Sequence, residues 1–160
     1  MEYRLQKKKL ERLTLLLSQD LGYIWGEKEC GPNGAKKEFL RVGVAFLKAL
    51  GNDLGLDNIK VRKNPSGIAV CGDVYLYGDW GPGNGFFATL TQAWDFPYRP
   101  ELLFRSLRDI NNSASGTNCY IDDAVFRDAD YDAMLRALRF CKERGEYRKA
   151  RSEVPDERAA

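Results

Sequence analysis

Histidine, the residue on which most acid–base and nucleophilic sites depend, is absent from this chain. Its absence excludes the Ser-His-Asp and Cys-His catalytic arrangements and the HExxH helix of zinc proteases. Asp, Tyr, Lys and Cys are the residue types left to carry a reaction, so an enzyme built on them stays open as a third hypothesis. We recognise no catalytic motif made of these types and expect no catalytic residues.

The four cysteines, Cys30, Cys71, Cys119 and Cys141, are the candidate soft metal ligands. They are widely separated and lack the paired CxxC spacing of a zinc site, so we expect no metal. The basic residues of 1–12 are not followed by an uncharged signal region, and no window holds the roughly 20 apolar residues that span a bilayer. We therefore expect a cytoplasmic protein with reduced thiols and no membrane contact.

Two other segments resemble ligand-binding loops but fail the tests of spacing. Counted from Asp128 as a calcium loop, positions six and twelve hold Ala133 and Arg139, where an EF-hand needs Gly and Glu. Asp128 and Asp130 are better explained as N-terminal caps of a following helix. The glycine-rich loop 78–85 is followed neither by Lys-Ser/Thr nor by a helical pattern, so it lacks the phosphate-binding fingerprints and we expect no cofactor.

Aromatic and basic residues are concentrated between positions 80 and 108. Aromatics and arginine are the types enriched at binding hot spots. We assign part of this group, including Phe86 and Phe87, to the hydrophobic core. The segment 94–100 contains two prolines, which disfavour a regular strand or helix, so we expect it to be an exposed loop. The residues that we assign to a partner-binding surface are Trp80, Trp94, Phe96, Tyr98, Arg99, Arg105 and Arg108.

The charge distribution supplies an alternative binding surface. Residues 1–65 hold 13 Lys and Arg against 8 Asp and Glu, whereas residues 66–160 hold 12 against 15. Such asymmetry can produce a basic face that binds the phosphates of a nucleic acid, although an ordinary solvated helix surface explains it too. The residues of this alternative surface are Lys7, Lys8, Lys9, Lys36, Lys37, Lys60, Arg62 and Lys63.

Two helices are predicted before any strand. Leucines 10, 13 and 17 recur at helical spacing within 3–21, with charged residues on the other side. A second helix is predicted from about residue 35 to 51–55, where Phe39, Val42, Phe46, Leu47, Leu50 and Leu54 form an apolar face. Both helices are expected to pack against a core.

Three strands are predicted to form an antiparallel meander at 59–63, 68–77 and 86–92. We favour a fourth strand over a short helix at 102–107, and a C-terminal helix is predicted at 130–144. Helices grouped beside strands indicate the α+β class. We predict one domain over residues 1–144 and a mobile polar tail at 145–160.

Two segments together resemble a group of known proteins. The first is Gly34-Ala-Lys-Lys-Glu-Phe-Leu-Arg, continued through Leu47 and 53–56, and the second is Asn64-Pro-Ser-Gly-Ile-Ala-Val-Cys-Gly-Asp-Val-Tyr-Leu76. They resemble small uncharacterised proteins of bacterial prophages, plasmids and integrative elements that share a KKEFL-like helix and an NPxGIAVSGEV-like segment. The chain departs from that pattern at Cys71, where serine is commoner, and at 107–110, where a basic, glycine-rich run is expected.

We therefore expect a non-enzymatic interaction module. The resemblance implies that this module belongs to a mobile genetic element and, by analogy, that it counters a host defence system by binding a host or element protein. The alternative is a nucleic-acid-binding accessory protein that uses the N-terminal basic face. Its binding would be weak and steeply salt-dependent, since it would depend on phosphate contacts.

We predict that all four cysteines are reduced in the native protein and that no metal copurifies, because the sequence has neither an export signal nor paired ligand spacing. Thiol titration under denaturing, non-reducing conditions should find four free thiols in each chain. A stoichiometric disulfide would overturn the compartment assigned here, and stoichiometric zinc would overturn the expectation that the cysteines bind no metal.

Overall fold

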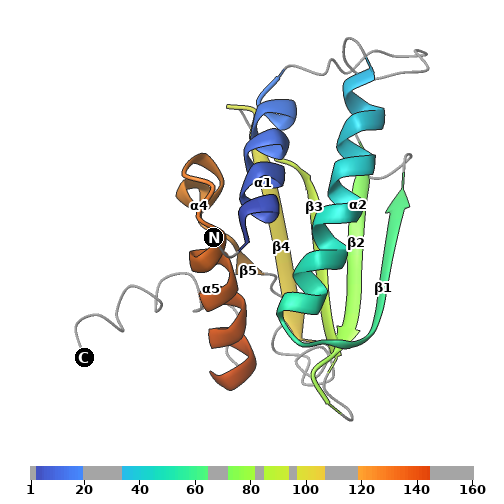
Figure 1. Cartoon of the computed structure of the whole chain (residues 1–160), viewed down its shortest axis with the longest axis vertical. Coiled ribbons are helices and arrows are strands. Elements are labelled where there is room, and N and C mark those ends of the chain that lie inside the picture. The colour runs from blue at the N-terminus through green and yellow to red at the C-terminus, as the bar shows by residue number, and fades with distance from the viewer. Residues whose placement is uncertain are drawn as a thin grey trace.

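In the computed structural model, helices and an antiparallel sheet form two layers (Figure 1). The structure describes residues 3–19, 34–64, 72–81, 85–93, 97–106 and 119–144. Its elements are α1 (Arg4–Leu17), α2 (Ala35–Asp53), β1 (Asp57–Asn64), β2 (Asp73–Asp79), β3 (Gly85–Gln92), β4 (Pro100–Ser106), β5 (Cys119–Tyr120), α4 (Asp123–Arg127) and α5 (Tyr131–Arg144).

The predicted α+β class is confirmed, and the segment favoured as a fourth strand is β4. Strand order in the sheet is β1-β2-β3-β4-β5, and every neighbouring pair is antiparallel. The prediction of three to four strands omitted β5, and the prediction of one C-terminal helix omitted α4. β5 has two residues and α4 has five, so neither is long enough to show a hydrophobic period, and the sequence pattern could not reveal them. The predicted tail 145–160 lies outside the described residues.

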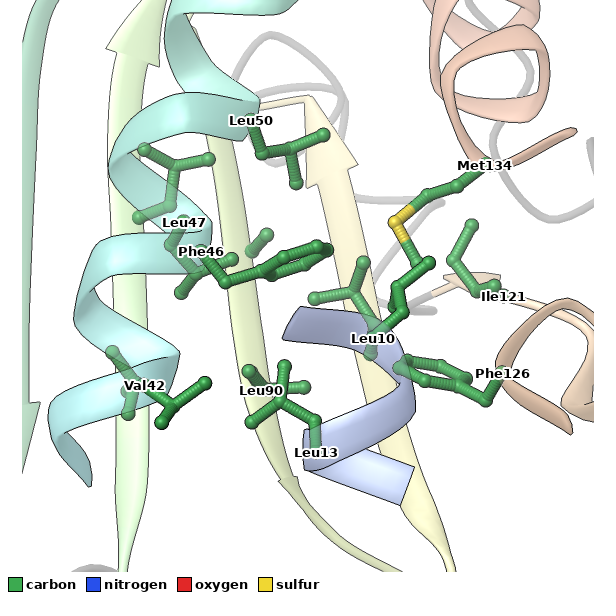
Figure 2. Close-up of a cluster of buried hydrophobic side chains, with 14 of the residues drawn as sticks. Leu10, Leu13, Val42, Phe46, Leu47, Leu50, Leu90, Ile121, Phe126 and Met134 are labelled. Atoms are coloured by element: carbon green, nitrogen blue, oxygen red, sulfur yellow. The ribbon is translucent and has the colours of Figure 1, made fainter. Parts of the chain in front are cut away.

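The core lies between the sheet and α1 and α2, and α4 and α5 extend it beside α1 with Phe126, Tyr131, Met134, Leu135 and Leu138 (Figure 1). Successive strand residues point to opposite faces, so every second residue of β2, β3 and β4 faces these helices. The buried residues on that face of the sheet are Val74, Leu76, Phe86, Ala88, Leu90, Leu102 and Phe104. Figure 2 shows Phe46 and Leu47 of α2, Leu10 and Leu13 of α1 and Leu90 of β3 meeting in this layer.

Glycines in α2 let the helix lie close to the sheet. A Cβ atom at Gly43 would lie 3.0 Å from Val74 Cγ2, and one at Gly51 would lie 3.1 Å from Ile59 Cδ1. Both distances are tighter than ordinary van der Waals contact, so a larger residue would push α2 away from β1 and β2. The buried Gln6 side chain, whose Nε2 donates to Phe46 O at 3.1 Å, joins α1 to α2 in the same layer.

Strand β1 contains an irregularity that sets the direction of its charged side chains. Asp57 lies opposite Asp79, but Lys60 lies opposite Tyr77, so two residues of β1 face one of β2. Asn58 adopts a left-handed backbone with φ of 55°, and its Nδ2 donates to Asp79 Oδ2 at 3.0 Å. Asparagine is one of the few residue types that tolerate this conformation.

The aspartates between 122 and 130 cap helices, but not all as predicted. Asp130 accepts a hydrogen bond from Ala133 N at 3.0 Å at the start of α5, as predicted. Asp128 does not cap α5: it stands at the C-terminal end of α4, a helix that the sequence pattern did not reveal. Asp122 caps that helix by accepting from Ala124 N at 3.0 Å.

Two leucines of α1 provide a matched test of the core. Leu13 is fully buried, whereas Leu15, two residues further along, is 55% exposed. We predict that Leu13→Ala lowers the free energy of unfolding by about 2 to 5 kcal/mol through the cavity that it leaves. Leu15→Ala should change it by less than about 0.5 kcal/mol. Urea denaturation measures both values, and equal losses for the two variants would contradict this orientation of α1.

Candidate functional site

The aromatic and arginine residues assigned from sequence to one partner-binding surface are distributed along the sheet. Trp80 follows β2, is half-buried and packs on Phe86, with ring centroids 4.8 Å apart. Tyr98 and Arg99 precede β4 at the other end, where Ala93 N donates to Arg99 O at 2.9 Å. The prediction of an exposed loop at 94–100 is wrong for its last residues: Tyr98 and Arg99 are half-buried, and Pro100 is buried as the first residue of β4. Trp94, Phe96 and Arg108 of that prediction lie outside the described residues.

The strand register fixes how far apart the two ends of the sheet are. Phe86 pairs with Ser106 at one end, and Gln92 pairs with Pro100 at the other. Six residues of strand extend about 20 Å. The structure therefore does not bring Trp80 together with Tyr98 and Arg99, and it places Arg105 on β4 closer to the Trp80 end.

The residues of the predicted basic face lie on two sides of the molecule. Lys8 and Lys37 are exposed on α1 and α2, with Lys9 and Lys36 half-buried beside them. Lys7 forms an ion pair with Asp132 of α5 at 3.7 Å. By contrast, Lys60 and Arg62 pair with Tyr77 and Tyr75, on the face of the sheet that points away from the core. Exposed Lys63 lies opposite the buried Val74.

The face of the sheet opposite the core holds the best-formed binding surface among the described residues. Its rows follow from the cross-strand register, because paired residues share a face. We call this surface the sheet site. One row is Lys60, Tyr77, Phe87 and Arg105, and the next is Arg62, Tyr75, Thr89, Leu103 and Tyr120.

Phe87 contacts two other aromatic rings of the sheet site, those of Tyr75 and Tyr77. The Tyr75 and Phe87 rings are stacked, with centroids 5.8 Å apart and planes 23° apart. The Tyr77 and Phe87 centroids are 4.7 Å apart. Tyr77 is 41% exposed, and Tyr75 and Phe87 are half-buried, so the group presents ring surface to solvent. Such a group can stack against flat ligands.

Cations lie on both sides of these rings. Lys60 and Arg62 are exposed on β1, and half-buried Arg105 lies on β4. The carboxylates of this face are at the ends of the strands. Asp73, which is buried, accepts a hydrogen bond from Tyr75 OH at 3.1 Å, and Asp79 accepts one from Asn58. Glu101 belongs to the row of Asp73. The two central rows therefore carry positive charge alone.

Sequence reasoning missed Tyr75 and Tyr77 and assigned Phe87 to the core. Phe86 is fully buried as predicted, but Phe87 points to the opposite face and is only half-buried. Consecutive residues of a strand cannot both face the core, because side chains alternate. The alternation Val74-Tyr75-Leu76-Tyr77 was the signal that could have revealed the site, since it places two tyrosines on one face.

Tyr131 has a pKa above its ordinary range, and the residue plays a structural part. Burial, and then a hydrogen bond that its hydroxyl donates to Asp53 Oδ2 at 2.7 Å, raise its pKa. Tyr131 is 0% exposed, so no substrate reaches its hydroxyl. Arg139 Nη2 donates to Asp53 O at 2.7 Å, and the two contacts together fasten α5 to the end of α2.

An open pocket of about 530 Å³ lies beside this junction and is lined by Tyr3, Arg4, Leu5, Gln6, Lys9, Ala49 and Asp53. The Gln6 Oε1 atom has no hydrogen-bond partner but is itself buried, so a molecule in the pocket would not reach it without rearrangement. The described residues include no cluster of three or more Cys, Asp or Glu able to hold a metal ion. No helix within the described ranges is long and apolar enough to cross a membrane.

Comparison of the chain with protein-family models, with curated proteins and with solved structures gives no match.

Tyr131→Phe tests whether the hydroxyl of Tyr131 stabilises the fold. We predict a loss of about 2 kcal/mol in the free energy of unfolding at neutral pH, because the hydrogen bond to Asp53 is removed. Wild-type stability should also fall as pH rises above about 10, since the unfolded chain then ionises Tyr131 while the folded protein keeps it neutral. The variant should lack that part of the pH dependence. Urea denaturation at neutral and alkaline pH measures both effects, and identical pH slopes would contradict the assignment.

Proposed function

We propose that this protein is a non-enzymatic binding module that holds single-stranded nucleic acid on its sheet site. The observation that carries the proposal is the contact group of Tyr75, Tyr77 and Phe87 on the face of the sheet opposite the core. Unpaired bases stack on aromatic side chains, and each stacked base contributes about 1 to 3 kcal/mol by alanine substitution.

The position of the cations supports a nucleic acid as the flat ligand. Lys60 and Arg62 on β1 and Arg105 on β4 are three strand spacings apart, or about 14 Å, with the rings between them. Bases stacked on the rings would leave their phosphates free to reach cations on either side. The absence of carboxylates from the two central rows favours an anionic ligand over a cationic one.

Rigid strands favour this site over a loop as a binding surface. The sheet site residues are held in register by backbone hydrogen bonds, and the hydrogen bond to Asp73 restrains the Tyr75 ring. Side chains ordered before binding lose less conformational entropy when the ligand docks. The role requires no chemical step, in keeping with a chain that has no histidine.

The prediction of a protein partner remains a prediction. Its residues Trp94, Phe96 and Arg108 lie outside the described ranges, and Trp80 contributes to packing against the core. Arg105 is common to that prediction and to the sheet site. The resemblance to proteins of mobile elements is compatible with either kind of partner.

Tyr77 provides a matched test, because it is 41% exposed and its loss should leave the fold intact. Tyr77→Ala should weaken binding to a labelled single-stranded oligonucleotide roughly 5- to 150-fold, the effect of losing one stacked base. Tyr77→Phe keeps the ring and should bind almost as the wild type does. Fluorescence anisotropy at low salt measures the affinities, and thermal melts check the fold.

Tyr98→Ala is the control for a general aromatic effect, because Tyr98 precedes β4 at the other end of the sheet. It should leave oligonucleotide affinity unchanged. The proposal fails if the wild type does not bind single strands, or if Tyr77→Ala binds as tightly as Tyr77→Phe.

A further inference from the structure

The outer surface of α1 and α2, on the side away from the sheet, carries one exposed stripe on each helix. On α1 the stripe is Leu5, Lys8, Arg12 and Leu15, and on α2 it is Lys37, Arg41, Ala45, Lys48 and Asn52, all of them exposed. Spacings of three and four residues align each set along its helix. The two helices pack side by side over the sheet (Figure 1), so both stripes face away from it.

We call the five cations of these stripes the cationic helix face: Lys8, Arg12, Lys37, Arg41 and Lys48. Two carboxylates, Glu11 and Glu38, lie among them. Arg12 donates to both Glu38 oxygens at 2.6 Å, and that contact lowers the pKa of Glu38. Arg41 Nη2 also lies 3.9 Å from Glu38 Oε2. With Glu11 and Glu38 counted against the five cations, the face keeps a net charge of +3.

We propose that the cationic helix face binds the phosphate backbone of double-stranded nucleic acid, so that the protein can hold a duplex on one side and a single strand on the other. The single-strand half of this inference rests on the proposed function, and the duplex half does not. Cations that neutralise phosphates supply most of the affinity in binding that is independent of sequence.

The composition of the two stripes favours a duplex over other anionic ligands. None of the nine stripe residues is aromatic, so unpaired bases would find no ring to stack on. An amphipathic helix that anchors in a membrane inserts a continuous apolar face. Here Lys8 and Arg12 separate Leu5 from Leu15, and the apolar face of α1 is buried in the core.

The two-layer architecture places the two surfaces on opposite sides of the molecule. α1 and α2 lie over one face of the sheet (Figure 1). The sheet site lies on the other face, and the cationic helix face consists of the exposed residues on the side of the helices away from the sheet. A ligand on one surface does not cover the other. Duplex and single strand should therefore bind simultaneously, without competition.

The test uses the full chain, a labelled duplex of about 20 base pairs and a single-stranded oligonucleotide, with affinities measured between about 50 and 200 mM salt. Lys37→Gln/Lys48→Gln should reduce the slope of log affinity for duplex against log salt by about 2, or roughly 0.9 for each lost phosphate contact. The same variant should keep its single-strand affinity. Tyr77→Ala should show the reverse pattern.

Arg127→Glu is the matched control, because it lowers the net charge of the protein by two, as Lys37→Gln/Lys48→Gln does. Arg127 is exposed on α4, on the far side of α1 from α2 (Figure 1). This variant should bind duplex as the wild type does. In addition, immobilised duplex should retain labelled single strand when the wild type or Arg127→Glu is added, and should retain none without protein.

Three results would overturn the inference: equal duplex binding by Lys37→Gln/Lys48→Gln and the wild type, equal losses in that variant and in Arg127→Glu, or competition between duplex and single strand. Binding to phosphatidylserine vesicles without duplex binding would assign the cationic helix face to membranes instead. If duplex binding behaves as expected but Tyr77→Ala leaves single-strand binding intact, the proposed function fails while the duplex surface stands.

Discussion

The alternation of side chains along β2, β3 and β4 is the constraint on which the rest of the structure depends. Because α1 and α2 cover one face of the sheet, every second residue must be apolar to fill the core. Val74 and Leu76 meet this requirement, and Tyr75 is thereby directed to the opposite face. A one-residue shift in register would bury the tyrosines and expose the core residues, so the core and the sheet site are fixed together.

The close approach of α2 to the sheet adds to this constraint. Gly43 and Gly51 allow the helix to contact Val74 and Ile59 without an intervening side chain. Close packing limits the sliding of helix on sheet, because neighbouring atoms have no free space to move into. The aromatic rings of the sheet site therefore lie on strands whose core-facing side chains are closely packed against α2.

A two-layer protein has two large outer surfaces, and this chain uses different residue types on each. The sheet presents aromatic rings between cations, as in Tyr77 and Arg105, whereas the helices present lysines and arginines along exposed stripes, as in Lys48. The first combination suits unpaired bases and the second suits a charged backbone.

The sequence by itself determined the α+β class, both N-terminal helices and the presence of four longer strands, because each has a hydrophobic period long enough to recognise. It did not fix the strand bounds: the strand predicted at 68–77 corresponds to β2 at Asp73–Asp79, and 68–71 lie outside the described residues. It also identified Asp130 as a helix cap. It did not determine α4 and β5, which are too short to show a period. Only the tertiary structure decided which side chains share a surface. Strand register joined Tyr75, Phe87 and Arg105, which are distant in sequence. The packing of α2 on the other face of the sheet separated Lys37 from Lys60. Both are long-range interactions that the local sequence pattern does not encode.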